Sequence, residues 1–183
     1  MIPDSRYIYD IVEIGGRALE FEDRFMIGCT TVRSELYGEE EPRGLLRLAN
    51  ERYYQFVVSR ALLSNYAYHV GVERGTHDFV ISAKAGEKSW LAVGEMKKWF
   101  SSVEEAEMPG MRADIQKLQR TGGSAFFLVV TFWPPDDGLR CLRALTAGLG
   151  LQHSDLIHHY SFRTISWAPE TVRDFALVGF RVK

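Results

Sequence analysis

The chain has 183 residues, of which 46% are hydrophobic and 25% charged, a composition typical of one globular domain with its own core. A formal net charge of −2 excludes binding of nucleic acid through overall basicity, although 22 Lys and Arg residues leave room for a local basic groove. Two distant cysteines, Cys29 and Cys141, predict a reducing cytoplasm, and no apolar run approaches the roughly 20 residues of a membrane span, so no membrane partner is expected.

Residues 1–42 are interpreted as an N-terminal extension, because their pattern is the least regular in the chain. Arg6–Val12 and Phe25–Val32 have the composition of strands, and Gly15-Gly16 predicts a turn. Glu39–Pro42 predicts a loop that leads into a helix. This segment either caps a sheet or forms part of a dimer contact, and the sequence allows both.

The pattern becomes helical from Arg43 to about Tyr66, where an apolar and aromatic stripe recurs at helical spacing. No proline or glycine interrupts this stretch after Gly44, and Glu51 falls in the middle of it. A long helix is therefore expected at the start of the core.

Three strands are predicted next, over Tyr68–Glu73, His77–Ala83 and Trp90–Trp99. Their connections are too short for crossovers, so we expect an antiparallel meander. The third strand begins apolar on both faces, which indicates a central strand that is covered on both sides.

The rest of the chain alternates helices and strands, with Pro109-Gly110 predicting a break before the first helix. The predicted helix, buried strand, helix and two late strands span Met111–Arg120, Ala125–Trp133, Leu139–Leu149, Tyr160–Trp167 and Phe175–Val182. This order predicts an α/β fold with a mixed central sheet flanked by helices. We expect a single domain over 1–183, with its core at 43–133 and a C-terminal helix and strands at 134–183 completing the sheet.

The third meander strand carries an anomaly. Side chains alternate along a strand, so Glu95 and Lys97 share the face of the apolar Val93. Charged groups seldom occupy such positions unless they are paired or bind a metal. Hairpin pairing would bring Asp78, from the preceding strand, close to them. Carboxylate oxygens are hard ligands that suit Mg²⁺ or Mn²⁺, and these ions also accept phosphate oxygens. A lysine beside them can stabilise the charge of the phosphate.

Asp78 followed by Glu95-Met96-Lys97 on consecutive meander strands resembles the PD-(D/E)xK superfamily, the restriction-endonuclease-like nucleases. The core of that superfamily is helix, three-strand meander, helix and strand, which matches the order predicted here. The resemblance implies that Asp78 and Glu95 bind Mg²⁺ or Mn²⁺ and that Lys97 assists catalysis. It also implies that Glu51, on the first helix, is a further metal ligand.

Three more residues are candidates for contact with nucleic acid. Lys117 and Gln119 lie on the helix after the Glu95–Lys97 strand, where many superfamily members carry polar residues, and Lys98 should point to the face opposite Lys97. The sequence departs from the family pattern at His77, which stands before Asp78 where a proline is common.

Simpler interpretations stay open for each of these residues. Glu95 and Lys97 also fit a surface salt bridge at a strand end, and Asp78 fits a turn beside Gly75. Glu51 fits a solvated helix position. Asp114 and Lys117, three residues apart, fit a helical ion pair.

The sequence thus predicts a metal-dependent nuclease that hydrolyses phosphodiester bonds, with nucleic acid, and DNA first, as its partner. The alternative is a catalytically inactive domain of the same fold that binds protein or nucleic acid. A third possibility is a regulatory protein in which the charged strand end is structural. Edge strands near the C-terminus make a homodimer possible.

Overall fold

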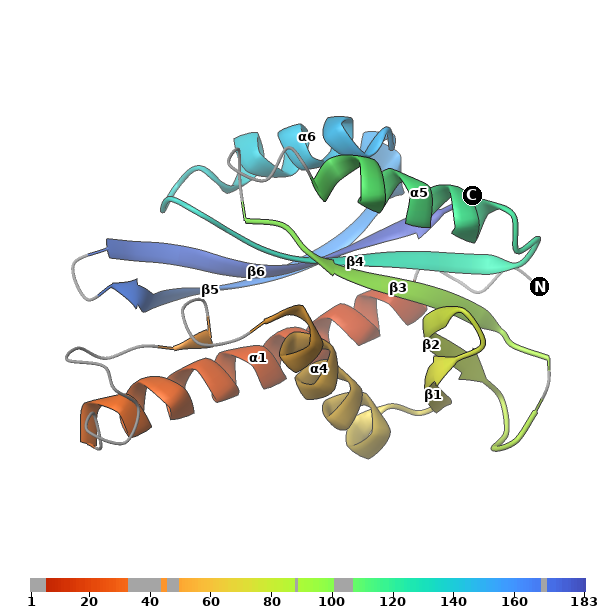
Figure 1. Cartoon of the computed structure of the whole chain (residues 1–183), viewed down its shortest axis with the longest axis horizontal. Helices are drawn as coiled ribbons and strands as arrows, with labels where there is room; N and C mark the ends of the chain where they lie inside the picture. The colour runs from red at the N-terminus through yellow and green to blue at the C-terminus, as the bar shows by residue number, and fades with distance from the viewer. Residues whose placement is uncertain (1–5, 33–43, 46–49, 88, 101–106, 169–170) are drawn as a thin grey trace.

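The computed structural model describes residues 6–32, 44–45, 50–87, 89–100, 107–168 and 171–183. A six-stranded mixed sheet lies between two layers of helices, so the predicted α/β class is confirmed (Figure 1). One face is covered by α1 (Arg6–Val32) and α4 (Glu51–Asn65), and the other by α5 (Met108–Gln119) and α6 (Gly138–Leu149).

The strands follow the order β1-β2-β3-β4-β6-β5, in which β3 and β4 are parallel and all other neighbours are antiparallel. Their bounds are His69–Arg74 (β1), His77–Ser82 (β2), Ala92–Lys98 (β3), Ser124–Trp133 (β4), Leu156–Ala168 (β5) and Thr171–Val182 (β6), and a short 3₁₀ turn, η2, spans His153–Asp155. The antiparallel meander and the buried fourth strand are therefore confirmed. Of the two late strands, β5 lies at the edge of the sheet and β6 lies inside it.

The prediction for the N-terminal segment was wrong, because Arg6–Val32 is one helix of 27 residues and not two strands with a turn. Its buried positions recur at helical spacing and include Ile8, Ile11, Val12, Gly15, Gly16 and Leu19. The two glycines are packing sites: a Cβ on Gly16 would lie 2.5 Å from Tyr160 of β5. The helix packs against β5 and β6, which confirms the expectation that this segment caps the sheet.

The helix α4 begins at Glu51 rather than at Arg43, because Asn50 caps it. The Asn50 side chain accepts a hydrogen bond from the backbone N–H of Tyr53 at 3.0 Å, which satisfies one free donor of the first turn. Glu51 therefore lies in the first turn and not in the middle of the helix, and its negative charge is favourable there. The predicted loop Glu39–Pro42 lies outside the described residues.

The other predicted elements lie close to the observed ones. The break expected at Pro109-Gly110 is the exception, because α5 begins at Met108 and takes Pro109 into its first turn, where a missing N–H has no consequence. Strand β5 is longer than predicted and starts at Leu156.

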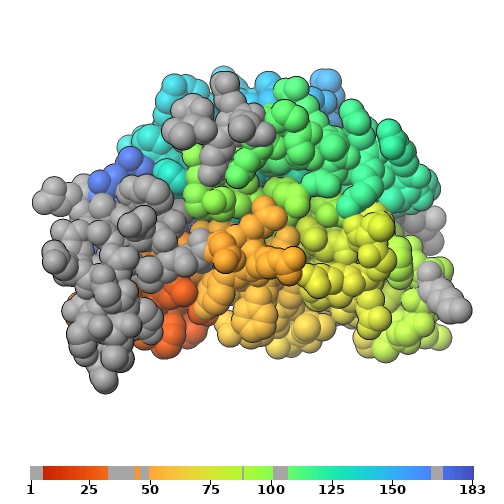
Figure 2. Space-filling model, viewed as in Figure 1, coloured from red at the N-terminus to blue at the C-terminus, as the bar shows by residue number. Residues whose placement is uncertain are grey.

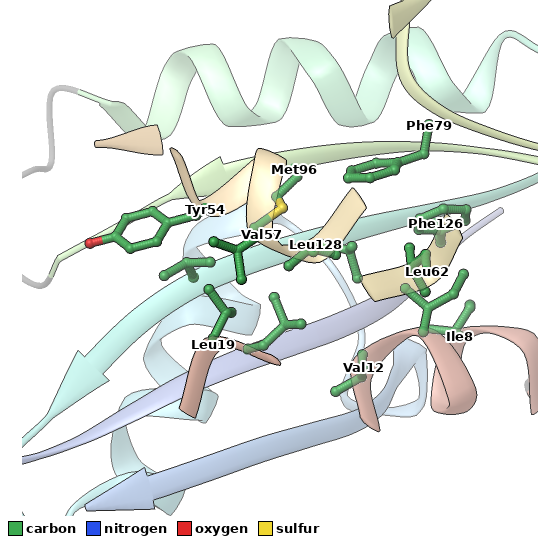
Figure 3. Close-up of a cluster of buried hydrophobic side chains, with 14 of the residues drawn as sticks. Ile8, Val12, Leu19, Tyr54, Val57, Leu62, Phe79, Met96, Phe126 and Leu128 are labelled. Atoms are coloured by element: carbon green, nitrogen blue, oxygen red, sulfur yellow. The ribbon is translucent and has the colours of Figure 1, made fainter. Parts of the chain in front are cut away.

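Apolar side chains fill the space on both sides of β3 and β4. Figure 3 shows the larger cluster, in which α1 and α4 meet the sheet through Ile8, Val12, Leu19, Tyr54, Val57, Leu62, Phe79, Met96, Phe126 and Leu128. The second cluster joins the opposite face to α5 and α6. The central position predicted for β3 is confirmed, and its first five residues, from Ala92 to Met96, are buried. None of the described helices is long and apolar enough to cross a bilayer.

Candidate active site

The strand β3 presents Glu95 and Lys97 toward α5. Glu95 is 3% exposed and lies on the same face as Val93, which packs against that helix layer. Met96 points the other way, into the cluster under α1 and α4. The alternation predicted from the sequence is therefore confirmed, and Glu95 is a carboxylate placed in a largely apolar layer.

Within the described ranges, one edge of β3 has no strand partner over its last residues. The register between β2 and β3 ends at the Phe79–Gly94 pair. Beyond it, Asp78 Oδ2 accepts a hydrogen bond from the Met96 N–H at 2.8 Å. Glu51 Oε2 accepts one from the Lys98 N–H, two residues further along the same edge, at 3.0 Å. Carboxylates from β2 and α4 thus replace the missing strand, and side chains from both helix layers meet at this edge.

Gln55 of α4 fixes the position of Asp78. Its side-chain amide donates to Asp78 Oδ2 and to the carbonyl of Met96, both at 3.2 Å. Gln55 lies one helical turn after Glu51, so the two side chains project from the same face of α4 toward β3. The Asp78 carboxylate is thereby held by two donors through a single oxygen.

Glu95 is paired on its own face of the sheet. Its Oε1 atom lies 2.6 Å from Lys117 Nζ of α5 and 3.1 Å from His77 Nδ1. Burial raises the pKa of the Glu95 carboxyl, the contact with Lys117 opposes this rise, and the charge of Asp78 adds to it. Lys117 also donates to the carbonyl of Thr76 at 2.7 Å, which ties α5 to the turn before β2.

Lys97 stands between two acids. Its Nζ atom lies 3.4 Å from Glu51 Oε1 and 3.6 Å from Asp114 Oδ2. Burial alone would lower the pKa of Lys97, but the charges of Glu51, Asp114 and Asp78 outweigh it and raise that pKa. The Lys97 side chain therefore carries its full positive charge at neutral pH.

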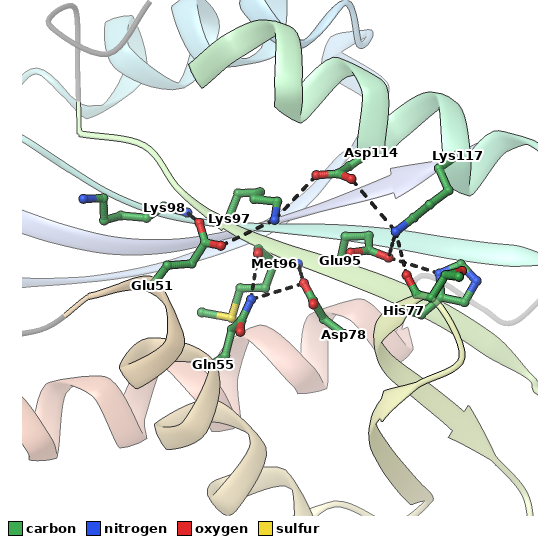
Figure 4. A network of polar contacts seen from close by, with 11 residues as sticks. Glu51, Gln55, His77, Asp78, Glu95, Met96, Lys97, Lys98, Asp114 and Lys117 are labelled. Atoms are coloured by element: carbon green, nitrogen blue, oxygen red, sulfur yellow. Dashed lines mark hydrogen bonds and ion pairs between the residues drawn. The ribbon is translucent and has the colours of Figure 1, made fainter. Parts of the chain in front are cut away.

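These contacts form two adjacent groups between α4, β2, β3 and α5, which we call the polar network (Figure 4). One group joins Asp78 and Gln55 to the Met96 backbone, and the other runs from Glu51 through Lys97, Asp114 and Lys117 to Glu95 and His77. Four carboxylates face two lysines, Lys97 and Lys117, so the network has two more acidic groups than lysines. Figure 2 shows the molecule from this side, with atoms of α4 in orange and atoms of α5 in green at the surface.

The structure brings together most of the predicted site residues: Glu51, Asp78, Glu95, Lys97 and Lys117. Two others lie apart from the network. The Lys98 ammonium lies 4.8 Å from the centre of the Phe100 ring, away from Lys97 as the alternation predicted. Gln119 is exposed near the end of α5. Their predicted contacts with nucleic acid stay predictions.

Sequence reasoning missed two members of the network and understated a third. Nothing in the sequence pattern indicated that His77 contacts Glu95, because strand alternation would place the two side chains on opposite faces. Gln55 could have been found from its one-turn spacing to Glu51. Asp114 forms the expected helical ion pair with Lys117, at 3.9 Å, and also reaches Lys97.

The carboxylate oxygens of Asp78 and Glu95 are the candidate ligands for a metal ion. No group of three or more His, Cys, Asp or Glu side chains is placed to hold a metal ion within the described part of the chain. Asp78 and Glu95, however, each use one oxygen for their contacts, and Asp78 Oδ1 and Glu95 Oε2 have no hydrogen-bond partner among the described residues. Mg²⁺ commonly binds one or two carboxylates and keeps its remaining waters. Asp78 on β2 and Glu95 on β3 therefore each keep one carboxylate oxygen that no described residue occupies.

No protein-family model, curated protein or solved structure matches this chain. The geometry of the polar network is consequently the basis on which function is inferred.

Proposed function

We propose that the protein is a divalent-metal-dependent phosphodiesterase with a restriction-endonuclease-like core, and that it cleaves nucleic acid, with DNA as the first candidate. The meeting of Glu51, Asp78, Glu95 and Lys97 at the carboxyl end of β3 carries this proposal. The succession α4-β1-β2-β3-α5-β4, with β3 parallel to β4, supports the same assignment. Cys29 and Cys141 are free thiols, which suits a cytoplasmic enzyme.

In this proposal Asp78 and Glu95 hold the ion through Oδ1 and Oε2, and Glu51 is a more distant acid. A bound Mg²⁺ would polarise the phosphodiester and lower the pKa of a coordinated water. Asp78 is preorganised for this task by the Met96 N–H and the Gln55 amide, because both fix its other oxygen.

Lys97 has the role of stabilising charge that develops on the phosphate. Its ammonium is held by Glu51 and Asp114 at the same edge of β3, and it stays protonated at neutral pH. A positioned cation of this kind acts on the transition state more strongly than on the substrate. The two excess acidic groups of the network favour binding of a divalent cation first, which would then allow an anionic backbone to approach.

A catalytically inactive domain of the same fold is the second candidate. The ion pair between Lys117 and Glu95, at 2.6 Å, favours it, because a lysine already neutralises the most buried acid of the polar network. The hydrogen bonds that Asp78 and Glu51 accept from β3 also have a purely structural use at an unpaired strand edge.

Cleavage of single-stranded and duplex DNA and of RNA, with Mn²⁺, Mg²⁺ or EDTA, separates the two candidates. We expect metal-dependent cleavage by the wild type and a loss of 100-fold or more, on the order of a removed charge-stabilising group, in Asp78→Asn and Lys97→Met. Lys84→Met removes an exposed lysine of the β2–β3 connection and should retain activity. Wild-type protein that cleaves none of these substrates supports the inactive domain, and cleavage that survives both site variants refutes the assigned residues.

A further inference from the structure

A cavity of about 670 Å³ lies beyond the carboxyl end of β3, against the neighbouring helices α5 and α6. Its size falls within the range of about 300–1,000 Å³ that small-molecule sites occupy. The walls combine Trp99, Phe132 and two prolines, Pro109 and Pro134, with the arginines Arg112 and Arg140. Flat apolar walls with guanidinium groups are the chemistry that nucleotides require.

Trp99 connects this cavity to the polar network. It follows Lys97 by two residues and packs, like Val93, in the α5–α6 layer. Lys97 and Trp99 therefore project to the same side of the sheet. Two residues of strand span about 6.8 Å. The indole Nε1 of Trp99 is buried and has no hydrogen-bond partner among the described residues. A buried donor of this kind is stabilised by an acceptor atom on a ligand.

The two arginines differ in how they are neutralised. Arg140 forms an ion pair with Asp137. The Arg112 Nε donates to the carbonyl of Gly148 at 2.6 Å, and within the described part of the chain Arg112 has no acidic partner. Its remaining guanidinium donors can therefore bind a phosphate, for which the planar group is well suited.

We infer that this cavity takes an unpaired nucleobase of the substrate, stacked on Trp99 with a neighbouring phosphate on Arg112. The inference rests on the proposed function, because the occupant is identified from Lys97, which precedes Trp99 by two residues. A nucleic-acid strand rises about 3.4 Å per nucleotide, so the stacked base lies about one or two nucleotides from the cleaved phosphate. A base inside a duplex cannot enter such a cavity. The substrate therefore has a single-stranded or extruded base next to the cleavage point.

Binding of an oligonucleotide that carries 2-aminopurine, titrated with Ca²⁺ in place of Mg²⁺, tests the inference, because Ca²⁺ takes the same oxygen ligands with a looser geometry. We expect quenching of the 2-aminopurine fluorescence by the wild type, and weaker binding of a perfect duplex. Trp99→Leu should bind about tenfold more weakly, as expected for the loss of one stacked base, and Trp99→Phe should keep most of the quenching. Arg112→Met, a change on the exposed surface, should weaken binding and reduce its dependence on salt. Phe25→Leu removes an aromatic ring that is 57% exposed on α1 and should change nothing.

Equal affinity of wild type and Trp99→Leu, together with an unaffected Arg112→Met, would overturn the inference, as would a preference for perfect duplex. These outcomes are independent of catalysis. Cleavage by a protein that does not quench the probe would leave the phosphodiesterase proposal intact and remove the base site. Quenching that depends on Trp99, without any metal-dependent cleavage, would keep the base site and remove the phosphodiesterase.

Discussion

Replacement of Lys117 by methionine tests how the buried acid of the network is stabilised. Lys117 and Glu95 lie 2.6 Å apart, with side chains that are 35% and 4% exposed. Exposed ion pairs contribute about 0–1 kcal/mol, and removing one partner of a fully buried pair costs about 3–5 kcal/mol. Because the lysine is about one-third exposed and its partner is buried, we expect Lys117→Met to lower the free energy of unfolding by about 2 kcal/mol at pH 8, between those limits. The melting temperature should fall by about 4–8 °C for a domain of this size.

The loss should depend on pH, with a sign that follows from Glu95. Its folded pKa is raised above the unfolded value, so the folded state binds the proton more tightly. Below the unfolded pKa, Glu95 is protonated in both states and Lys117 has no charge to neutralise. As pH rises through the folded pKa, the buried carboxylate becomes charged, and without Lys117 this charge lowers the free energy of unfolding. The difference between wild type and Lys117→Met should therefore grow from pH 4.5 to pH 8.

Urea unfolding followed by fluorescence at both pH values measures this difference, and a double variant gives the control. Glu95→Gln in the Lys117→Met background removes the buried charge, so most of the lost stability should return. Mg²⁺ or Mn²⁺ should stabilise Lys117→Met more than the wild type, because a bound cation replaces the lysine. A loss that is the same at pH 4.5 and pH 8, or that Glu95→Gln does not relieve, would refute the assignment of Lys117 as the counter-charge of Glu95.

Three further changes have defined outcomes. Gly94→Ala should destabilise the protein by about 1–3 kcal/mol, as for overpacked cores, because the new Cβ would overlap the Phe126 ring; unchanged urea unfolding would mean that this ring moves freely. Glu95→Gln alone should remove part of the fall in wild-type stability as pH rises above 4.5, and parallel pH profiles of the two proteins would contradict the raised pKa. Asn50→Ala should lower the free energy of unfolding by about 1 kcal/mol through loss of the hydrogen bond from Tyr53, and Asn50→Asp, which keeps an acceptor, should not.

The fold of the core could be predicted because its signals are local. Short connections determine a meander, and alternation along β3 places Glu95 and Lys97 on one face whatever the rest of the chain does. The approach of Asp78 to this strand followed from the same hairpin geometry. Alternation does not predict where the pairing of β2 with β3 ends. In the structure it ends at Gly94, so the Met96 N–H donates to Asp78 instead of to a strand.

The first helix could not be predicted from the same rules, because its core face contains two glycines where a helix usually has larger residues. Gly15 and Gly16 were interpreted as a turn, whereas their missing side chains let α1 approach Leu177, Val58 and Tyr160 closely. That reason lies in residues more than 40 positions away.

Binding of Mn²⁺ to the metal-free protein, followed by calorimetry or electron paramagnetic resonance, tests the central claim most directly. The wild type should bind one ion with micromolar to millimolar affinity, and Asp78→Asn and Glu95→Gln should each weaken it at least tenfold. Glu87→Gln, at an exposed acid of the β2–β3 connection, should bind as the wild type does. A wild-type protein that binds no Mn²⁺, or binding that persists unchanged when both Asp78 and Glu95 are replaced, would contradict the proposed metal site.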